Sequence, residues 1–240
     1  MLLLALDTAT DGVAVAVCDG ERLLASRRAG DARHHNEVLT PTVGAVLAEA
    51  GAARADVTDV AVGVGPGPYT GLRVGLVTAQ ALALAWGARL HGVCSLDALA
   101  ADAVERGAVT AARAGSGEPV EFLVATDARR REVHTARYRL DAPEVDGEPL
   151  TGLRRTAGPD VVAPAAVERG TLPVVGRGTL LHPDALGPAA EPFDVDAGAL
   201  ARLAVLALAG RAHLPLLPVE PLYLRRPDAV VPAGPKRVTG

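Results

Sequence analysis

The segment from Val62 to Gly75 constrains the fold more than any other part of the chain. It joins an apolar strand to an apolar helix through the turn Gly65-Pro66-Gly67-Pro68. Glycine allows backbone angles that other residues resist, whereas proline fixes φ and removes a hydrogen-bond donor. The segment lacks the Gly-Lys-Ser/Thr ending of a phosphate-binding loop. We therefore interpret Gly65, Pro66 and Gly67 as a stiff structural loop.

The helix predicted at residues 71–86 carries almost no polar face. Thr70 is its predicted N-terminal cap and Gly87 its predicted C-terminal stop. Because a surface helix normally shows a polar face, this one should be covered on two sides. Small residues recur along it every four positions, at Gly71, Gly75, Ala79 and Ala83. The spacing leaves two alternatives, a partner helix from a second subunit or burial within its own domain, and by itself it favours burial.

Charge and composition argue against several function classes. The 240 residues carry a formal net charge of −4, which gives no basic surface for holding nucleic acid unaided. Lys236 is the only lysine, so a buried catalytic lysine is not expected. Cys18 and Cys94 show no Cys-x-x-Cys spacing, which favours reduced thiols in a cytoplasmic protein. No apolar run is both long and unbroken enough to predict a membrane span.

The apolar pattern predicts an α/β chain with two related halves. The elements expected in residues 1–114 follow the order βββαβαβα: strands at 2–6, 13–18 and 22–28, a helix capped by Thr40-Pro41, a strand at 60–64, the helix at 71–86, a strand at 90–93 and a helix capped by Ser95. An apolar strand at 120–125 that ends near Asp127 and returns at 133–140 repeats the opening of the chain, where Asp7 follows the first strand.

This weak repeat of topology predicts a smaller, less regular second lobe at 115–210. Its remaining elements are a helix at 160–169, a strand at 172–175 and a helix at 199–209. A proline-rich tail at 211–240 should run extended over the surface.

Carboxylates and hydroxyls gather where the first strand turns, at Asp7, Thr8 and Thr10, and Asp127 would face them from the other half. Such a set could meet a hydrated metal or a phosphate. The alternative is that these side chains only satisfy backbone groups in turns, which the spacing by itself favours. No metal-binding or nucleophile motif accompanies them.

Four segments together resemble one family. They are Leu4-Ala5-Leu6-Asp7-Thr8-Ala9-Thr10, Gly65-Pro66-Gly67-Pro68-Tyr69-Thr70-Gly71-Leu72-Arg73-Val74-Gly75, Asp127-Ala128-Arg129 with Glu132-Val133, and Pro221-Leu222-Tyr223-Leu224-Arg225. The chain resembles the TsaB family, also called YeaZ, although Pro68 and Tyr69 stand where members usually carry Ser and Phe. The resemblance implies an α/β fold of two ribonuclease-H-like lobes of the actin/Hsp70/sugar-kinase type, each with a mixed sheet flanked by helices.

The resemblance also implies a function in making threonylcarbamoyladenosine beside the anticodon of tRNAs. The expected role is a non-catalytic subunit that binds and supports the catalytic sister subunit TsaD, together with the small ATPase TsaE, and that meets tRNA only through the complex. Ser95 and Leu99 stand where TsaD has two metal-binding histidines, so no metal is expected. Asp7, Thr8, Thr10 and Asp127 would then form a vestigial nucleotide cleft, and no cofactor is expected. Weak binding of a nucleotide in this cleft, or at the interface with partner subunits, stays open as an alternative.

The family pairs through the first two helices of its N-terminal lobe, in homodimers and with the sister subunit. Carried onto this chain, the predicted interface is Leu39, Val43, Val46, Leu47, Gly71, Leu72, Arg73, Gly75, Leu76, Ala79 and Ala83. Two other hypotheses stay open: an ATP-dependent phosphotransferase or peptidase acting on its own, and a homodimeric binding protein unconnected with tRNA.

Overall fold

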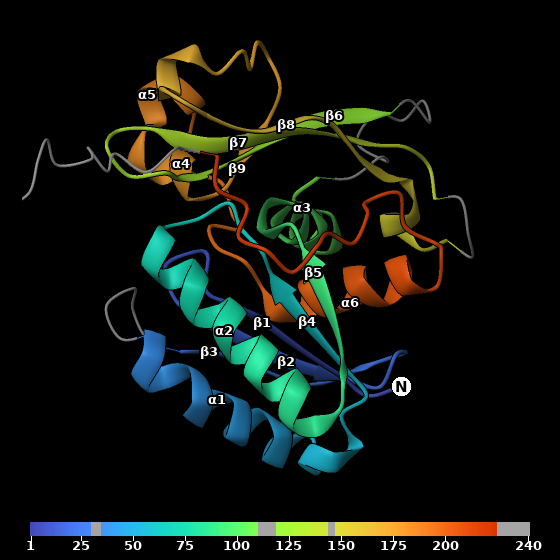
Figure 1. Ribbon diagram of the computed structural model, residues 1–240. Coiled ribbons are helices and arrows are strands. Elements are labelled where there is room, and N and C mark those ends of the chain that lie inside the picture. Colours follow the sequence, from blue (N-terminus) through green and yellow to red (C-terminus); the bar gives the residue numbers. More distant parts are fainter. Residues whose placement is uncertain (30–34, 110–118, 144–146, 225–240) are drawn as a thin grey trace, which may run out of the picture.

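The computed structural model describes residues 1–29, 35–109, 119–143 and 147–224, and it shows two sheets with helices between and around them (Figure 1). The first sheet has the strand order β3-β2-β1-β4-β5 and the second has the order β8-β7-β6-β9. The strands are β1 (Leu3–Asp7), β2 (Val13–Cys18), β3 (Leu23–Ala29), β4 (Asp59–Gly63), β5 (Arg89–Val93), β6 (Val120–Asp127), β7 (Val133–Leu140), β8 (Leu153–Val162) and β9 (Val174–Val175).

The helices are α1 (His35–Glu49), α2 (Tyr69–Trp86), α3 (Ser95–Glu105), α4 (Arg177–Leu181), α5 (Pro183–Leu186) and α6 (Ala197–Leu208), with short 3₁₀ turns at Arg54–Asp56, Pro149–Gly152 and Pro164–Ala166. Four of them, α1, α2, α3 and α6, cover the two faces of the first sheet, whereas α4 and α5 lie in the second lobe. Leu4 and Leu6 of β1 pack with α1 and α2, whereas Leu3 and Ala5 pack with α3 and α6. This alternation follows from the two-residue period of a strand that is buried on both faces.

The two sheets repeat one topology, as the sequence predicts. β1 pairs antiparallel with β2 and parallel with β4. In the second lobe β6 pairs antiparallel with β7 and parallel with β9. The order βββαβαβα of the first lobe is confirmed, and so is the α/β fold with two mixed sheets flanked by helices.

The C-terminal part of the chain returns to the first lobe. Helix α6 was predicted as part of the second lobe, but it packs on β1 and β2. Beyond it, Leu217 N donates to Gly92 O at 2.8 Å and Leu222 N donates to Val64 O at 2.8 Å. The reason is that one face of the first sheet would otherwise remain uncovered, so the apolar face of α6 gains more burial there.

Several predicted boundaries are wrong. Helix α1 begins at His35 rather than at Thr40-Pro41, and Pro41 lies inside it. The helix predicted at 160–169 does not form, because β8 continues to Val162 in register with β7 and a 3₁₀ turn follows. Local pattern is overridden here by pairing with a strand that is distant in the sequence.

Helix α2 matches its prediction more closely. It starts at Tyr69 and ends at Trp86, and Gly87 follows in the left-handed conformation with φ 67°. The residue before the helix is Pro68, which makes no side-chain cap, so Thr70 lies within the first turn and is not the cap. No helix among the described residues is long and apolar enough to cross a membrane.

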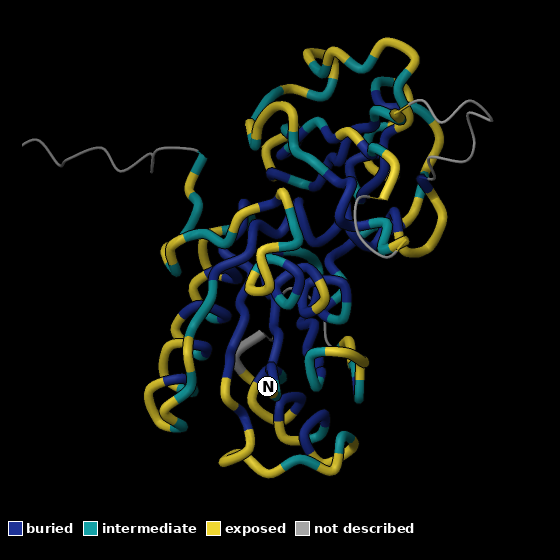
Figure 2. The backbone as a smooth tube through the Cα atoms, turned by 90° about the vertical axis from the view of Figure 1, so that its right-hand side faces the viewer, coloured by how far each residue is buried: buried dark blue, intermediate teal, exposed yellow. Residues whose placement is uncertain are grey.

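The face of α1 and α2 that was predicted to meet a partner lies inside the protein. Buried residues run through the interior of both lobes, and exposed residues follow the loops and the outer helix faces (Figure 2). Ten of the eleven predicted interface residues are buried against the first sheet: Leu39, Val43, Val46, Leu47, Gly71, Leu72, Gly75, Leu76, Ala79 and Ala83. Only Arg73 is exposed. The interface assignment is therefore wrong for those ten, because an apolar helix face satisfies its own sheet first.

Candidate functional site: the closed cleft between the lobes

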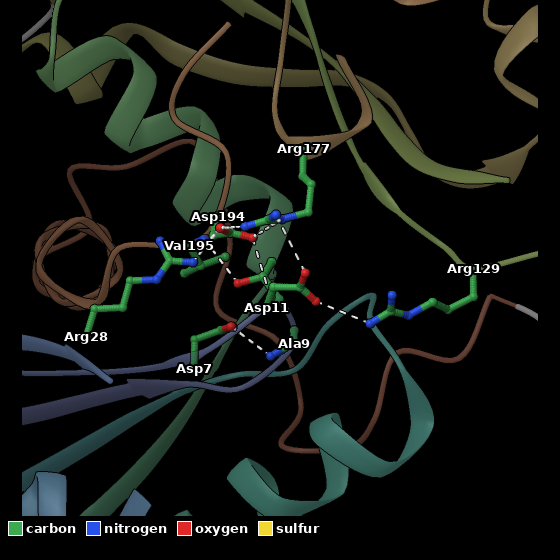
Figure 3. Close-up of polar contacts among 9 residues, drawn as sticks. Asp7, Ala9, Asp11, Arg28, Arg129, Arg177, Asp194 and Val195 are labelled. Atoms are coloured by element: carbon green, nitrogen blue, oxygen red, sulfur yellow. Dashed lines mark hydrogen bonds and ion pairs between the residues drawn. The ribbon is translucent and has the colours of Figure 1, made fainter. Parts of the chain in front are cut away.

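Asp7, one of the four predicted cleft residues, is completely buried at the end of β1. Its Oδ2 accepts a hydrogen bond from Ser95 Oγ at 2.6 Å. Its Oδ1 accepts one from Ala9 N at 2.8 Å (Figure 3). Burial raises the pKa of Asp7, and the hydrogen bonds from Ser95 and Ala9 oppose that shift. Both oxygens thus have partners inside the protein, and the carboxylate holds the start of α3 to the end of β1.

Ser95 does not cap its helix, contrary to the prediction. It is the first residue of α3, and the position before the helix is Cys94. Besides donating to Asp7, the Ser95 hydroxyl accepts a hydrogen bond from Gly65 N at 3.2 Å. The Gly-Pro loop, β1 and α3 are therefore joined through a single hydroxyl.

Thr8 inserts its hydroxyl into helix α2. Its Oγ1 donates to Gly71 O at 2.7 Å and accepts from Gly75 N at 3.0 Å. In a regular helix these two backbone groups would bond each other, so the hydroxyl takes the place of one helical hydrogen bond. A Cβ at position 75 would lie 2.4 Å from Thr8 Oγ1. Glycine is required at position 75 by this intramolecular contact.

The Gly-Pro loop packs directly on the turn that follows β1. Gly65 has φ +97°, which favours glycine, and a Cβ at Gly67 would lie 2.5 Å from Ala9 O. Pro66 is buried. The geometry is that of a loop fitted against its own protein and leaves no cradle for a phosphate.

Asp127 occupies the place in the second lobe that Asp7 occupies in the first. Its Oδ1 accepts a hydrogen bond from Arg129 N at 2.7 Å, the same turn that Asp7 makes with Ala9. Unlike Asp7 it also forms an ion pair, from Oδ2 to Arg129 Nη1 at 2.8 Å. Its carboxylate is therefore engaged within its own lobe.

Asp194, in the segment that leads from the second lobe into α6, forms ion pairs with two arginines. Arg28 Nη2 lies 2.5 Å from its Oδ2, and Arg177 Nε donates to its Oδ1 at 2.8 Å. Burial tends to raise the pKa of Asp194, but the hydrogen bond and charge of Arg177 and the charge of Arg28 outweigh it, so the pKa is lowered. In the same segment, Val195 N donates to Thr10 Oγ1 at 3.3 Å.

Asp11 extends these ion pairs across the cleft. It follows β1 in the first lobe, and both arginines that pair with it belong to the second lobe: Arg129 Nη2 to Asp11 Oδ1 at 3.2 Å, and Arg177 Nη1 to Asp11 Oδ2 at 3.6 Å (Figure 3). The side chains form a continuous series of alternating charges, Arg28, Asp194, Arg177, Asp11, Arg129 and Asp127.

Between the lobes, the described residues enclose a cavity of about 10 Å³. It is lined by Ala9, Thr10, Asp11, Pro68, Thr126, Asp127, Arg129, Arg177 and Asp194. That volume admits about one water molecule, so this cavity is too small for a nucleotide. Of the four predicted cleft residues, the structure brings Thr10 and Asp127 to this cavity, whereas Asp7 and Thr8 point into the first lobe.

The sequence pattern missed Asp11, Arg28, Arg177 and Asp194. Asp11 could have been found from its place beside the Asp-Thr turn. The other three lie in segments with no distinctive spacing, and only the fold brings them together.

A larger cavity, of about 530 Å³, lies along α6 beside the β2–β3 turn and contains none of the predicted site residues. Three charged side chains in its lining are paired with one another. Arg202 binds Glu105 through Nε at 3.2 Å and also forms an ion pair with Glu148.

Comparison with known proteins places this geometry in a family. The family model described as TsaD, tRNA N6-adenosine threonylcarbamoyltransferase, matches residues 29–168, more than half of the chain. The solved structure of YeaZ from Pseudomonas aeruginosa superposes with a TM-score of 0.70 at 29% identity, covering 93% of this chain and 99% of that one. The chain belongs to the TsaB/YeaZ family.

Two further relatives come from Escherichia coli and Mycobacterium leprae. The tRNA threonylcarbamoyladenosine biosynthesis protein TsaB of Escherichia coli is 33% identical over 141 residues, which are 59% of this chain and 56% of that protein. Protein ML0378 of Mycobacterium leprae is 41% identical over 234 residues, which are 95% of this chain. The chain spans only 56% of that relative's length.

In this TsaB/YeaZ chain, the side chains at positions 95 and 99 of α3 make contacts inside the protein. Ser95 is bonded to Asp7, and Leu99 is completely buried in the core. Within the described parts of the chain, no group of three or more His, Cys, Asp or Glu side chains could hold a metal ion.

Proposed function

We propose that this protein is a non-catalytic subunit in the biosynthesis of tRNA threonylcarbamoyladenosine. It binds and supports a TsaD-type sister subunit, which transfers the threonylcarbamoyl group to the adenosine next to the anticodon. The names of the relatives support the pathway, since the tRNA threonylcarbamoyladenosine biosynthesis proteins TsaB of Escherichia coli and Bacillus subtilis match at 33% and 28% identity.

The observation that carries the non-catalytic role is the closed cleft. Both oxygens of Asp7 are bonded inside the protein, and ion pairs from Asp11 to Arg129 and Arg177 fill the space between the lobes. A phosphotransferase of this fold would need that space for its nucleotide. Here the cavity of about 10 Å³ supports binding of a partner as the function rather than turnover.

The outer faces of α1 and α2 supply the partner surface. Val77 is 62% exposed and Leu84 is 86% exposed, and they lie on one face of α2 because they are seven residues apart. On the neighbouring α1, Pro41, Gly44 and Ala48 are exposed. Large apolar side chains on one helix face favour a protein–protein contact. The proposed interface thus lies on the two predicted helices, but on the faces opposite to the predicted interface residues.

The remaining features of the assembly follow from this role. The net charge of −4 supports contact with tRNA through the complex rather than alone. A TsaE-type ATPase joins the same complex in the cytoplasm, and the isolated protein forms a homodimer through the same outer faces. No cofactor of its own is required.

The experiment is co-purification with the TsaD-type subunit from the same cell. Leu84→Glu and Val77→Glu should weaken binding by roughly tenfold or more, because each buries a charge in an apolar contact. Leu181→Glu is the matched control, since Leu181 is also exposed but lies on α4 in the second lobe.

Unchanged binding in both α2 variants would overturn the proposed surface. The competing hypothesis of an independent enzyme predicts ATP or peptide turnover by the isolated protein that disappears in Asp7→Ala. Detection of such turnover would overturn the non-catalytic role.

A further inference from the structure

The last described residues form a strap across α2 and the edge of the first sheet. This strap, residues 217–224, begins where Leu217 N donates to Gly92 O at 2.8 Å and is held again where Leu222 N donates to Val64 O at 2.8 Å. A Cβ at Gly92 would lie 2.6 Å from Leu217 O, so a glycine is required for the strap to lie this close. The strap is a fitted part of the fold over these residues.

The strap ends in an aromatic cluster at the start of α2. The rings of Tyr223 and Tyr69 are stacked, with centroids 5.2 Å apart and an interplanar angle of 21°. The guanidinium of Arg73 lies 3.9 Å from the centroid of the Tyr69 ring, and its Nε donates to Tyr223 Oη at 3.0 Å. Each of these side chains fixes the other two, which reduces the entropy that a binding partner would have to remove.

This cluster is exposed although two of its three members are aromatic. Tyr69 is 49% exposed and Tyr223 is 38% exposed, in a chain with only 2% aromatic residues. Tyrosine and arginine are the residue types most enriched among the anchors of protein interfaces. Arg73 also lies on the same face of α2 as Val77 and Leu84, about 16 Å from Leu84 along the helix axis. The cluster and the exposed apolar positions therefore form one continuous surface.

Charge indicates what this surface accepts. Arg73 is the only charged residue in α2, and its described contacts are a ring and a hydroxyl rather than a carboxylate. A partner carboxylate could pair with it and would be desolvated by the two rings, which strengthens such a bond. The complement is an apolar surface that carries an Asp or Glu at the end nearest the start of α2.

We propose that the strap completes the partner-binding surface, with Tyr69, Arg73 and Tyr223 as an anchor for an acidic residue on an apolar surface of the TsaD-type subunit. The inference rests on the proposed function and deepens it. It means that the C-terminal segment, distant in sequence from α2, takes part in recognition of the same partner.

The test is titration of the TsaD-type subunit onto the full chain and its variants at low and moderate salt. Arg73→Ala and Tyr223→Ala should each weaken binding by roughly tenfold. Arg73→Ala should also reduce the dependence of binding on salt, because one ion pair is lost. Tyr223→Phe should weaken binding less, since the stack remains and only the hydroxyl is removed. Arg54→Ala, an exposed arginine in the 3₁₀ turn Arg54–Asp56, is the matched control.

The outcomes separate this inference from the function on which it rests. If Leu84→Glu weakens binding but Arg73→Ala and Tyr223→Ala bind like the unaltered protein, the anchor is overturned and the function stands. If none of the three weakens binding, the partner surface itself falls. If the anchor variants change only self-association or contact with tRNA, the TsaD-type subunit is the wrong occupant. Unchanged thermal unfolding of Tyr223→Ala shows that the loss is one of contact rather than of folding.

Discussion

Two hydroxyl groups join neighbouring elements at the carboxyl ends of β1 and β5. Thr8 Oγ1 bonds two backbone groups of α2, and Ser95 Oγ joins Asp7 to Gly65 N. Both hydroxyls are buried, so replacing either would leave backbone or carboxylate groups without a partner. Residues that would suit phosphate chemistry in an open cleft serve here to fix a helix and a loop.

At the same scale, His134 on β7 should make stability depend on pH. Burial lowers its pKa to about 4, with the charge of Asp127 opposing, and its Nδ1 has no hydrogen-bond partner. Its folded pKa lies below the ordinary 6.5, so the unfolded chain binds more protons between these values. The contribution of neutral His134 to the free energy of unfolding is fully present above pH 6.5. It falls by about 1–3 kcal/mol as the pH drops towards 4, because the unfolded chain takes up the proton more readily than the folded protein.

Urea unfolding at pH 7.5 and pH 5.0 measures this loss. His134→Asn should make the change in stability from pH 7.5 to pH 5.0 less unfavourable than in the unaltered protein, whereas His182→Asn, a half-buried residue between α4 and α5, should leave that change as it is. Burial raises the pKa of Glu105 to about 7, which favours the folded state as the pH falls, but this effect is shared by both variants and cancels in the comparison. An equal pH dependence in His134→Asn would assign the effect to other groups.

At the scale of elements, α2 has two apolar faces, one packed on the first sheet and one exposed. Gly71 and Gly75 let the helix approach Thr8 and the sheet, and Leu72 and Ala79 are completely buried there. Its other face exposes Val77 and Leu84. The absence of a polar face in the sequence is explained by a helix with one apolar face for its sheet and a second apolar face left outside.

Two glycines in neighbouring helices should therefore respond oppositely to alanine. Gly44→Ala on α1 should raise the free energy of unfolding by about 0.5–1 kcal/mol, since alanine favours a helix and a Cβ there meets nothing within 4 Å. Gly75→Ala on α2 should lower it by about 1–3 kcal/mol, because its Cβ would displace Thr8 Oγ1 from the helix.

Chemical denaturation of the two variants, compared at equal protein concentration, gives both values. Because Gly44 lies on the outer face and Gly75 on the inner face, an unaffected Gly75→Ala would mean that Thr8 is not inserted as described.

At the scale of the whole molecule, polar contacts join the lobes on two sides of α3. On one side, Tyr138 Oη donates to Asp97 Oδ1 at 2.7 Å and Arg155 Nη1 donates to the same oxygen at 2.8 Å. On the cleft side, the ion pairs centred on Asp194 and Asp11 close the space that a nucleotide would need. Contacts on both sides of α3 therefore hold the two lobes together.

Asp194→Asn should open the cleft side. The amide carries no charge, so Arg28 and Arg177 are left without their shared carboxylate in a largely buried site, and the free energy of unfolding should fall by about 2–4 kcal/mol. Hydrogen exchange should rise in the segment before α6. Asp19→Asn, which removes a surface ion pair with Arg22 but keeps an oxygen that can accept from Glu21 N and Arg22 N, should change the free energy of unfolding far less. Equal changes in the two variants would contradict a lock at Asp194.

The sequence by itself determined the strand, Gly-Pro turn and helix around Val62 to Gly75, and also the repeated strand pairing of the two lobes. These features depend on side-chain periodicity and turn chemistry, which act between residues close in the chain. Only the tertiary structure decided which face of α2 is outside, that α6 and the strap return to the first lobe, and that the cleft is closed. Those outcomes depend on contacts between distant residues, such as Thr8 with Gly71 at a separation of 63 residues and Ser95 with Asp7 at 88. No local pattern records them, because each requires the burial of one segment to compete with that of another.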